Sequence, residues 1–180
     1  EFLDSGNLGL TGTYGTRDGV IHAAAVKALH AAQAHGKPVF LMAVTIFNHS
    51  EHGVSMERVP ESIRTAAGKV MDSAAERDNL ADYVWRTRDF EAAYASTRAA
   101  VLGGARPTVL AWFGGHQPAF ANAPGLRGRI KSSAAAPAVP DRYLTWYDIA
   151  SNTGHPQAGE RRHRMDVVFL PGLLAQRAGV

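Results

Sequence analysis

The feature that most constrains the fold of this chain is an uninterrupted apolar run at residues 38–47, PVFLMAVTIF. The run holds no charged side chain, and β-branched and aromatic residues dominate it. Such a run is typical of a strand that is covered on both faces, as strands of parallel sheets are. It ends at the polar sequence NHSEHG, so we expect a loop at the carboxyl end of this strand.

A second apolar run, PTVLAWF, lies at residues 107–113, and a long helical segment separates the two runs. The helix is predicted to start at Ser73, which forms a capping-box pattern with Glu76, and to end at Gly103 and Gly104. The order of strand, helix and strand predicts a right-handed crossover between parallel strands. We therefore expect an α/β fold with a largely parallel central sheet.

Three further elements complete the expected domain. An alanine-rich helix is predicted over residues 20–35, with Asp18 as its cap. Residues 142–149 are a candidate third strand, and residues 165–179 are predicted to form a closing helix with Pro171 in or near its first turn. A chain of 180 residues suits one domain, so we expect residues 1–180 to fold as a single unit.

The charged residues limit the classes of partner. Residues 119–141 combine Pro, Gly, Ala and Ser with basic side chains, and they predict a flexible surface loop. Arg127, Arg129 and Lys131 in this loop could attract an anionic ligand. The net charge is only +3, and the basic residues form no long stripe with interleaved aromatic residues. We therefore expect no nucleic-acid partner.

The composition also excludes some chemistry. The chain has no cysteine, so disulfides, thiolate metal sites and cysteine nucleophiles are excluded. It has no apolar stretch of about 18 residues, as a membrane span requires, and its first residues lack the pattern of a signal peptide. Any membrane anchor is therefore expected to lie outside this sequence.

Polar residues follow both of the predicted parallel strands. Asn48 and His49 follow the first strand, and His116 follows Gly114 and Gly115 after the second. Because ligands bind at the carboxyl ends of parallel strands, we expect the two imidazoles to meet at one edge of the sheet. Neutral imidazole binds transition metals, and protonated imidazole stabilises phosphate or sulfate oxygens. The alternative for each histidine is an ordinary hydrogen-bonding surface residue.

The other histidines are weaker candidates. Glu51 and His52 could belong to the same loop site as His49, but HSEHG lacks the spacing and the helical context of an H-E-x-x-H zinc motif. His22, His30 and His35 lie on or near the first helix, where a solvated side chain is the simplest interpretation.

The order of four segments resembles a known family. KPVFLMAVTIFNHSEHG, DYVWRTRDFEAAY, PTVLAWFGGHQP and DVVFLPGLLAQRAG resemble the C-terminal half of the alkaline-phosphatase-like superfamily. The similarity is to the branch of sulfatases and lipoteichoic-acid-synthase-type phosphoglycerol or phosphoethanolamine transferases. This resemblance implies a three-layer αβα architecture, incomplete in this chain, and an extracytoplasmic or periplasmic location.

The resemblance also implies roles for single residues. The family carries Phe-Gly-Asp-His-x-Pro after the second strand, and its Asp and His bind manganese or zinc. Phe113, Gly114, His116 and Pro118 match this motif, whereas Gly115 stands where the family has the aspartate. His116 is thereby implied to be a metal ligand.

The segment after the first strand carries the other implied roles. His49, with Asn48 beside it, is implied to contact the transferred phosphate or sulfate group as a catalytic residue. The family's nucleophile comes from an N-terminal half that this sequence does not include, so no nucleophile is assigned.

Two functional hypotheses follow from these residues. The first is a truncated sulfatase-like or phosphoglycerol-transferase-like domain that acts on phosphate or sulfate esters through a divalent metal. The second is a non-catalytic α/β module that binds anions, with Arg127 and Arg129 closing over the ligand. An upstream N-terminal half or a second copy of the chain is the expected protein partner.

Overall fold

A computed structural model describes residues 15–49, 51–118, 120, 145–153 and 166–179. It contains helices and a small sheet, so the α/β class expected from the sequence is confirmed at this coarse level. The elements in chain order are α1 (Asp18–Gln33), the 3-10 turn η1 (Met56–Arg58), α2 (Glu61–Gly68), α3 (Ala74–Leu102), β1 (Val109–Phe113), β2 (Tyr147–Ser151), the 3-10 turn η4 (Val167–Phe169) and α5 (Leu170–Ala178).

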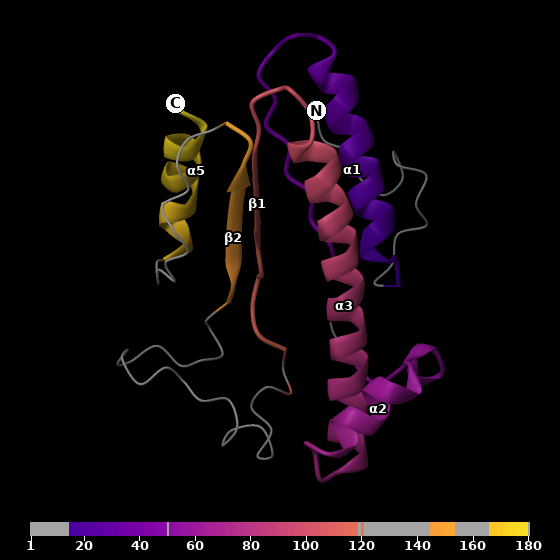
Figure 1. Cartoon of the computed structure of the whole chain (residues 1–180). Coiled ribbons are helices and arrows are strands. Elements are labelled where there is room, and N and C mark those ends of the chain that lie inside the picture. Colours follow the sequence, from indigo (N-terminus) through magenta and orange to yellow (C-terminus); the bar gives the residue numbers. More distant parts are fainter. Residues whose placement is uncertain (1–14, 50, 119, 121–144, 154–165, 180) are drawn as a thin grey trace.

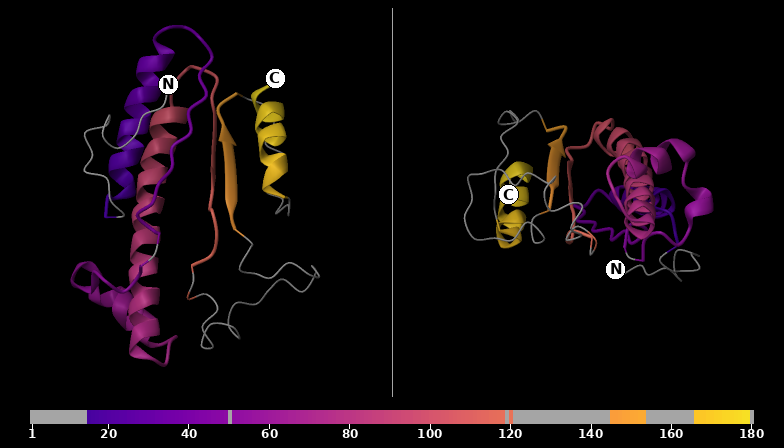
Figure 2. Two further views of the ribbon diagram at one scale, coloured as in Figure 1. Left: turned by 180° about the vertical axis from the view of Figure 1, so that it is seen from behind. Right: turned by 90° about the horizontal axis from the view of Figure 1, so that it is seen from below.

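The long helix α3 is the element around which the others are arranged. In Figure 1 it runs the length of the molecule, with α1 beside it and α2 across its N-terminal end. The strands β1 and β2 lie next to α3, and α5 lies on the other side of the strands, as the two views of Figure 2 confirm.

The sheet differs from the predicted one. Within the described ranges it has two strands, and β1 pairs with β2 in the antiparallel sense, from Val109 opposite Ser151 to Phe113 opposite Tyr147. The third predicted strand, residues 142–149, corresponds to β2 but is displaced toward the C-terminus. The expectation of a largely parallel central sheet is not met.

The apolar run at residues 38–47 is not a strand in the described structure, so this prediction is wrong. The run nevertheless lies alongside β1 in the predicted, parallel direction. Near its start, the Arg106 side chain donates to the carbonyl of Lys37, and after its end the ring of His49 lies 6.1 Å from the ring of His116. Both ends are therefore held beside the matching ends of β1, without ladder hydrogen bonds between them.

The helices α1, α3 and α5 form where the local sequence signals predicted them, whereas α2 lies in a segment expected to be mainly loop. The hydroxyl of Ser73 accepts from the backbone N–H of Glu76 at 3.2 Å and donates to the Glu76 carboxylate at 2.9 Å, which confirms the capping box of α3. Pro171 lies in the first turn of α5, where its missing N–H has no consequence, and Gly179 ends that helix with a φ of 78°.

Two packed clusters fix α3 to its neighbours. At its N-terminal end, buried Ala81 packs with Val59, Ile63 and Ala67 from the segment that contains α2. Further along, the rings of Phe90 and Tyr94 stack at 5.9 Å, and both contact Trp112 of β1 edge-on. The Tyr94 hydroxyl donates to Asp148 of β2 at 2.9 Å, and burial raises the Tyr94 pKa.

Asp18 has a different role from the predicted one. Arg17, rather than Asp18, is the N-cap residue of α1, and no side chain caps the helix. The Asp18 side chain is 1 % exposed and accepts from the backbone N–H of Phe47 and the hydroxyl of Thr45, so it fixes the end of the apolar run to α1. Burial raises its pKa to about 6, and its Oδ1 has no hydrogen-bond partner among the described residues.

We predict that Asp18→Asn reduces the loss of stability between acidic and neutral pH. The folded-state pKa of about 6 lies above the usual aspartate value of 3.8, so the stability that depends on protonated Asp18 is fully present below about pH 4 and is lost as the pH rises through 6. Asparagine keeps the acceptor without the buried charge, so the difference should shrink by on the order of 2 kcal/mol. Urea denaturation at pH 4 and pH 7 measures it, with Asp72→Asn at an exposed position as the control. Equal behaviour of the two variants would contradict the assignment.

Candidate functional site

The two histidines selected from the sequence lie at one edge of the molecule. The ring centroids of His49 and His116 are 6.1 Å apart and the ring planes are inclined by 85°. Both residues are exposed, one after the apolar run and the other after β1. The predicted convergence is therefore confirmed, although the predicted parallel ladder that was expected to cause it is absent from the described residues.

The backbone around His116 leaves one of its ring nitrogens available. Its Nδ1 lies 2.9 Å from the carbonyl oxygen of Gln117, an atom that can only accept, so we assign the proton to Nδ1. In the neutral ring, Nε2 then carries the lone pair. A histidine that donates one N–H to a carbonyl and presents the other nitrogen has the arrangement of a metal-ligating imidazole.

The two glycines before His116 differ in their surroundings. A Cβ at Gly114 would overlap the hydroxyl of Thr145, and the Gly114 N–H donates to the carbonyl of Trp146 at 3.0 Å. Glycine at position 114 thus allows the close approach of the chain that leads into β2. A Cβ at Gly115 would meet no atom within 4 Å, so this position has room for a side chain.

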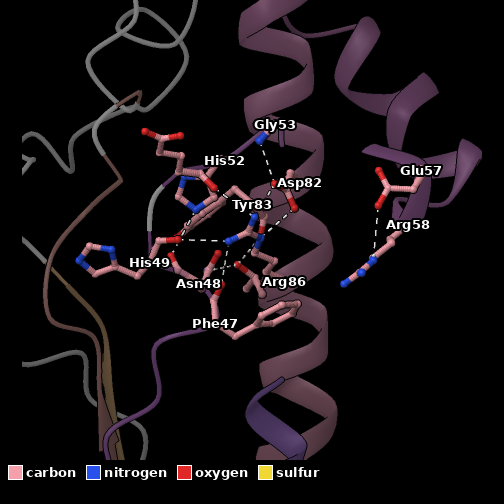
Figure 3. Close-up of polar contacts among 12 residues, drawn as sticks. Phe47, Asn48, His49, His52, Gly53, Glu57, Arg58, Asp82, Tyr83 and Arg86 are labelled. Atoms are coloured by element: carbon pink, nitrogen blue, oxygen red, sulfur yellow. Dashed lines mark hydrogen bonds and ion pairs between the residues drawn. The ribbon is translucent and has the colours of Figure 1, made fainter. Parts of the chain in front are cut away.

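A buried arginine holds the loop that carries His49. Arg86 of α3 is 5 % exposed, and Figure 3 shows its guanidinium facing the loop while the His49 ring points away from α3. The guanidinium donates to three backbone carbonyls, those of Phe47 at 2.9 Å, His49 at 3.2 Å and Glu51 at 3.1 Å. It also lies over the Phe47 ring, 5.3 Å from its centroid.

Asp82, one turn earlier on α3, completes this contact. It is fully buried and accepts from Arg86 through both carboxylate oxygens, at 2.8 and 2.7 Å. The same carboxylate accepts from the N–H of Gly53 at 2.8 Å, and Gly53 has a φ of 80° with Asn79 where a Cβ would lie. Asp82, Arg86 and Gly53 therefore form the structural support of the loop. We call Asp82 and Arg86 the Asp82–Arg86 pair.

The sequence did not single out the Asp82–Arg86 pair. Its only signal is an acidic and a basic residue four positions apart on a helix, which is the usual pattern of a solvated helix surface.

Asn48 and His52 are engaged in local contacts. The amide of Asn48 donates to the Thr87 hydroxyl at 2.9 Å, and its Oδ1 is buried without a hydrogen-bond partner in the described part of the chain. His52 lies 3.2 Å from the Asn48 carbonyl and contacts the rings of Tyr83 and Phe120. Burial and the nearby Arg86 charge lower the His52 pKa, so this ring is neutral at pH 7. Anion binding by Asn48 stays a prediction.

A surface pocket of about 470 Å³ lies beside His49. Phe47 and Trp85 form part of its wall, and His49 and Arg58 line it together with Glu51. The Arg58 side chain is 64 % exposed and lies 3.4 Å from Glu57. Because a surface ion pair of this kind is weak, Arg58 can turn toward a ligand at little cost.

The side chains present supply only part of a divalent metal site. His116 fits a metal ligand in its hydrogen bonding, and His49 lies close to it, but no group of three or more His, Asp or Glu is arranged to hold a metal within the described ranges. Catalytic zinc sites commonly use three protein ligands, so further ligands are required. Arg127 and Arg129 lie outside the described residues.

Comparison with known proteins adds no family assignment. No family model, curated protein or solved structure matches this chain. The resemblance of its motifs to the alkaline-phosphatase-like superfamily therefore stays an expectation. None of the described helices is both long and apolar enough to cross a membrane.

We predict that Arg86→Lys lowers the free energy of unfolding by about 2 to 3 kcal/mol. Lysine keeps the charge but cannot reach three carbonyls and two carboxylate oxygens at once. Arg64→Lys is the matched control, since the Arg64–Glu61 ion pair on α2 is largely exposed and its loss should cost about 0.5 kcal/mol or less. Urea denaturation measures both. Similar small losses in the two variants would show that the buried contacts do not anchor the loop.

Proposed function

We propose that the His49–His116 edge binds the phosphate or sulfate group of an ester, as part of a sulfatase-like or phosphoglycerol-transferase-like domain. The observation that carries this proposal is the 6.1 Å approach of the two imidazoles, which come from separate parts of the sequence. Two imidazoles at this separation can contact different oxygens of one tetrahedral anion. Each contact is a charge-assisted hydrogen bond when the ring donates an N–H to the anion.

The surroundings of His49 fix its backbone and, among the described residues, add no second cation beside its ring. Arg58 lines the pocket next to His49, but Figure 3 shows Arg58 on the far side of α3 from the His49 ring. The charge of the neighbouring Arg86 is neutralised by Asp82, and its N–H groups donate to carbonyls of the loop. Arg86 therefore positions His49 and does not contact the ligand. Glu51 lines the same pocket and disfavours an anionic group inside it, so the anion is placed at the histidine rings.

The family resemblance refines this role. His116 would be one ligand of a manganese or zinc ion, through the Nε2 that its hydrogen bond to Gln117 leaves available. His49 would neutralise charge on the transferred group. The nucleophile and the carboxylate ligands would come from an upstream half of the polypeptide, and the substrate would be a phospholipid headgroup, a polysaccharide or a sulfate ester in an extracytoplasmic compartment.

A second candidate function is a non-catalytic anion-binding module. The observation that favours it is Gly115, which leaves the position beside His116 without the carboxylate that a metal site of this family uses. In this case the two histidines hold the ester without transforming it. The two candidates share the anion site and differ in metal binding.

The anion site is tested with inorganic phosphate and p-nitrophenyl phosphate as probes. His49→Ala and His116→Ala should each weaken binding about tenfold, because each removes a hydrogen bond to a charged ligand. His35→Ala, at an exposed position after α1, is the control and should bind like the wild type. Titration followed by the histidine ring resonances measures the dissociation constants. Undiminished binding in both variants would refute the proposal.

Metal binding separates the two candidates. Gly115 has room for a side chain, so Gly115→Asp should add a carboxylate beside His116 and raise the affinity for Mn²⁺ about tenfold or more. Gly104→Asp is the matched control, since a Cβ there also meets no atom within 4 Å. Calorimetric titration with MnCl₂ measures the affinity, and His116→Ala should abolish the gain. If Gly115→Asp behaves like Gly104→Asp, the non-catalytic module is the better description.

A further inference from the structure

Three aromatic rings form a closed cluster beside the two candidate site histidines. His52, Tyr83 and Phe120 pack against one another with ring centroids 5.4, 5.4 and 5.5 Å apart. The ring planes of each pair are inclined by 74°, 83° and 79°, so every contact is edge-on, which is a favoured arrangement of aromatic rings. We call these three residues the ring cluster. Because each ring contacts both of the others, no ring can shift without disturbing two contacts.

The ring cluster draws its members from three segments of the chain. His52 comes three residues after His49 in the loop that follows the apolar run, and Phe120 comes four residues after His116. Tyr83 belongs to α3, the element that anchors the backbone of the His49 loop. The cluster therefore links the His49 loop, the segment of His116 and the long helix at one place.

Two hydrogen bonds near His116 lead away from α3. The N–H of Gly114 donates to the carbonyl of Trp146 in the chain that leads into β2, and the Nδ1–H of His116 donates to a carbonyl of its own segment. Phe120, by contrast, brings the segment against both α3 and the His49 loop through its ring. Its contacts therefore bear directly on how far His116 lies from His49.

We propose that Phe120 is a positioning residue of the His49–His116 edge: its ring, packed against His52 and Tyr83, sets the separation of the two imidazoles. Hydrogen bonds weaken steeply as their distance and angle depart from the optimum, so two imidazoles share one tetrahedral anion only while their separation is fixed. Phe120 acts through His116 in this role. The effect on anion affinity rests on the proposed function, whereas the effect on the ring separation does not.

The ring separation is measured first, in the full chain without ligand. Nuclear Overhauser cross-peaks between the ring protons of His49 and His116 report it, because edge-on rings with centroids 6.1 Å apart bring these protons close together. The wild type should show the cross-peak, and Phe120→Ala should lose it. Phe120→Tyr keeps the ring and should restore the cross-peak. Phe169→Ala is the control, since it removes an aromatic side chain that is 66 % exposed in η4, and it should keep the cross-peak of the wild type.

A second variant reaches the ring cluster from the helix. Tyr83→Leu removes a ring, and leucine is a good helix former, so this variant should weaken the same cross-peak without disturbing α3. Far-ultraviolet circular dichroism monitors the helices in every variant. The test therefore does not depend on the folding of Phe120→Ala alone.

Titration with inorganic phosphate measures the consequence for binding. Phe120→Ala should weaken binding about tenfold, as expected when one of two imidazole hydrogen bonds is misplaced, and Phe120→Tyr should bind like the wild type. In the His116→Ala protein, Phe120→Ala should add no further loss, because no second imidazole remains to be misplaced. A residue with a merely structural role would add its own loss in this background.

Four results would overturn the positioning role. They are a wild type without the cross-peak, a cross-peak that persists in both Phe120→Ala and Tyr83→Leu, a cross-peak that Phe169→Ala loses equally, and a further loss of phosphate binding when Phe120→Ala is added to His116→Ala. A cross-peak that depends on Phe120 in a protein that binds no phosphate would support the positioning role and refute the proposed function alone. The two failures are therefore distinguishable.

Discussion

The contact between Arg86 and the loop after the apolar run is the interaction on which the candidate site depends. One guanidinium binds three carbonyl groups of residues 47–51, and Asp82 neutralises its charge in a position without solvent. An irregular segment has no ladder to hold its backbone, so its carbonyls need side-chain donors. The buried pair supplies them, and it thereby transfers the rigidity of α3 to the backbone of His49. The position of the exposed His49 ring is therefore set by the buried contact between Arg86 and the loop backbone.

Helices α3 and α5 could be predicted because their signals are local. The capping box of Ser73 and Glu76 predicts the start of α3 from four residues. Pro171 and Gly179 mark the two ends of α5. The lack of a strand at residues 38–47 could not be predicted in the same way. Composition shows that a segment suits a covered strand, but a strand also requires backbone partners, and these are set by distant parts of the chain.

The candidate site was predictable in its outline and not in its support. His49 and His116 converge because both ends of the apolar run are held beside β1, so the crossover argument gave the correct direction even though the ladder is missing. The structural role of Arg86 was not predicted, because Asp82 and Arg86 have the spacing of a surface ion pair on a helix. Burial, which distinguishes a structural pair from a surface one, is a property of the tertiary structure.

The missing ladder connects the exposed apolar surface with the anchored site. Between Pro38 and Val44 the backbone forms no hydrogen bond to the part of the chain that the structure describes, and most side chains are exposed, whereas from Thr45 onward Asp18 and then Arg86 bind the chain. The boundary between the open segment and the anchored segment falls inside one apolar run, so composition alone does not cause it. It lies where α1 and α3 first bring buried charged groups to the backbone.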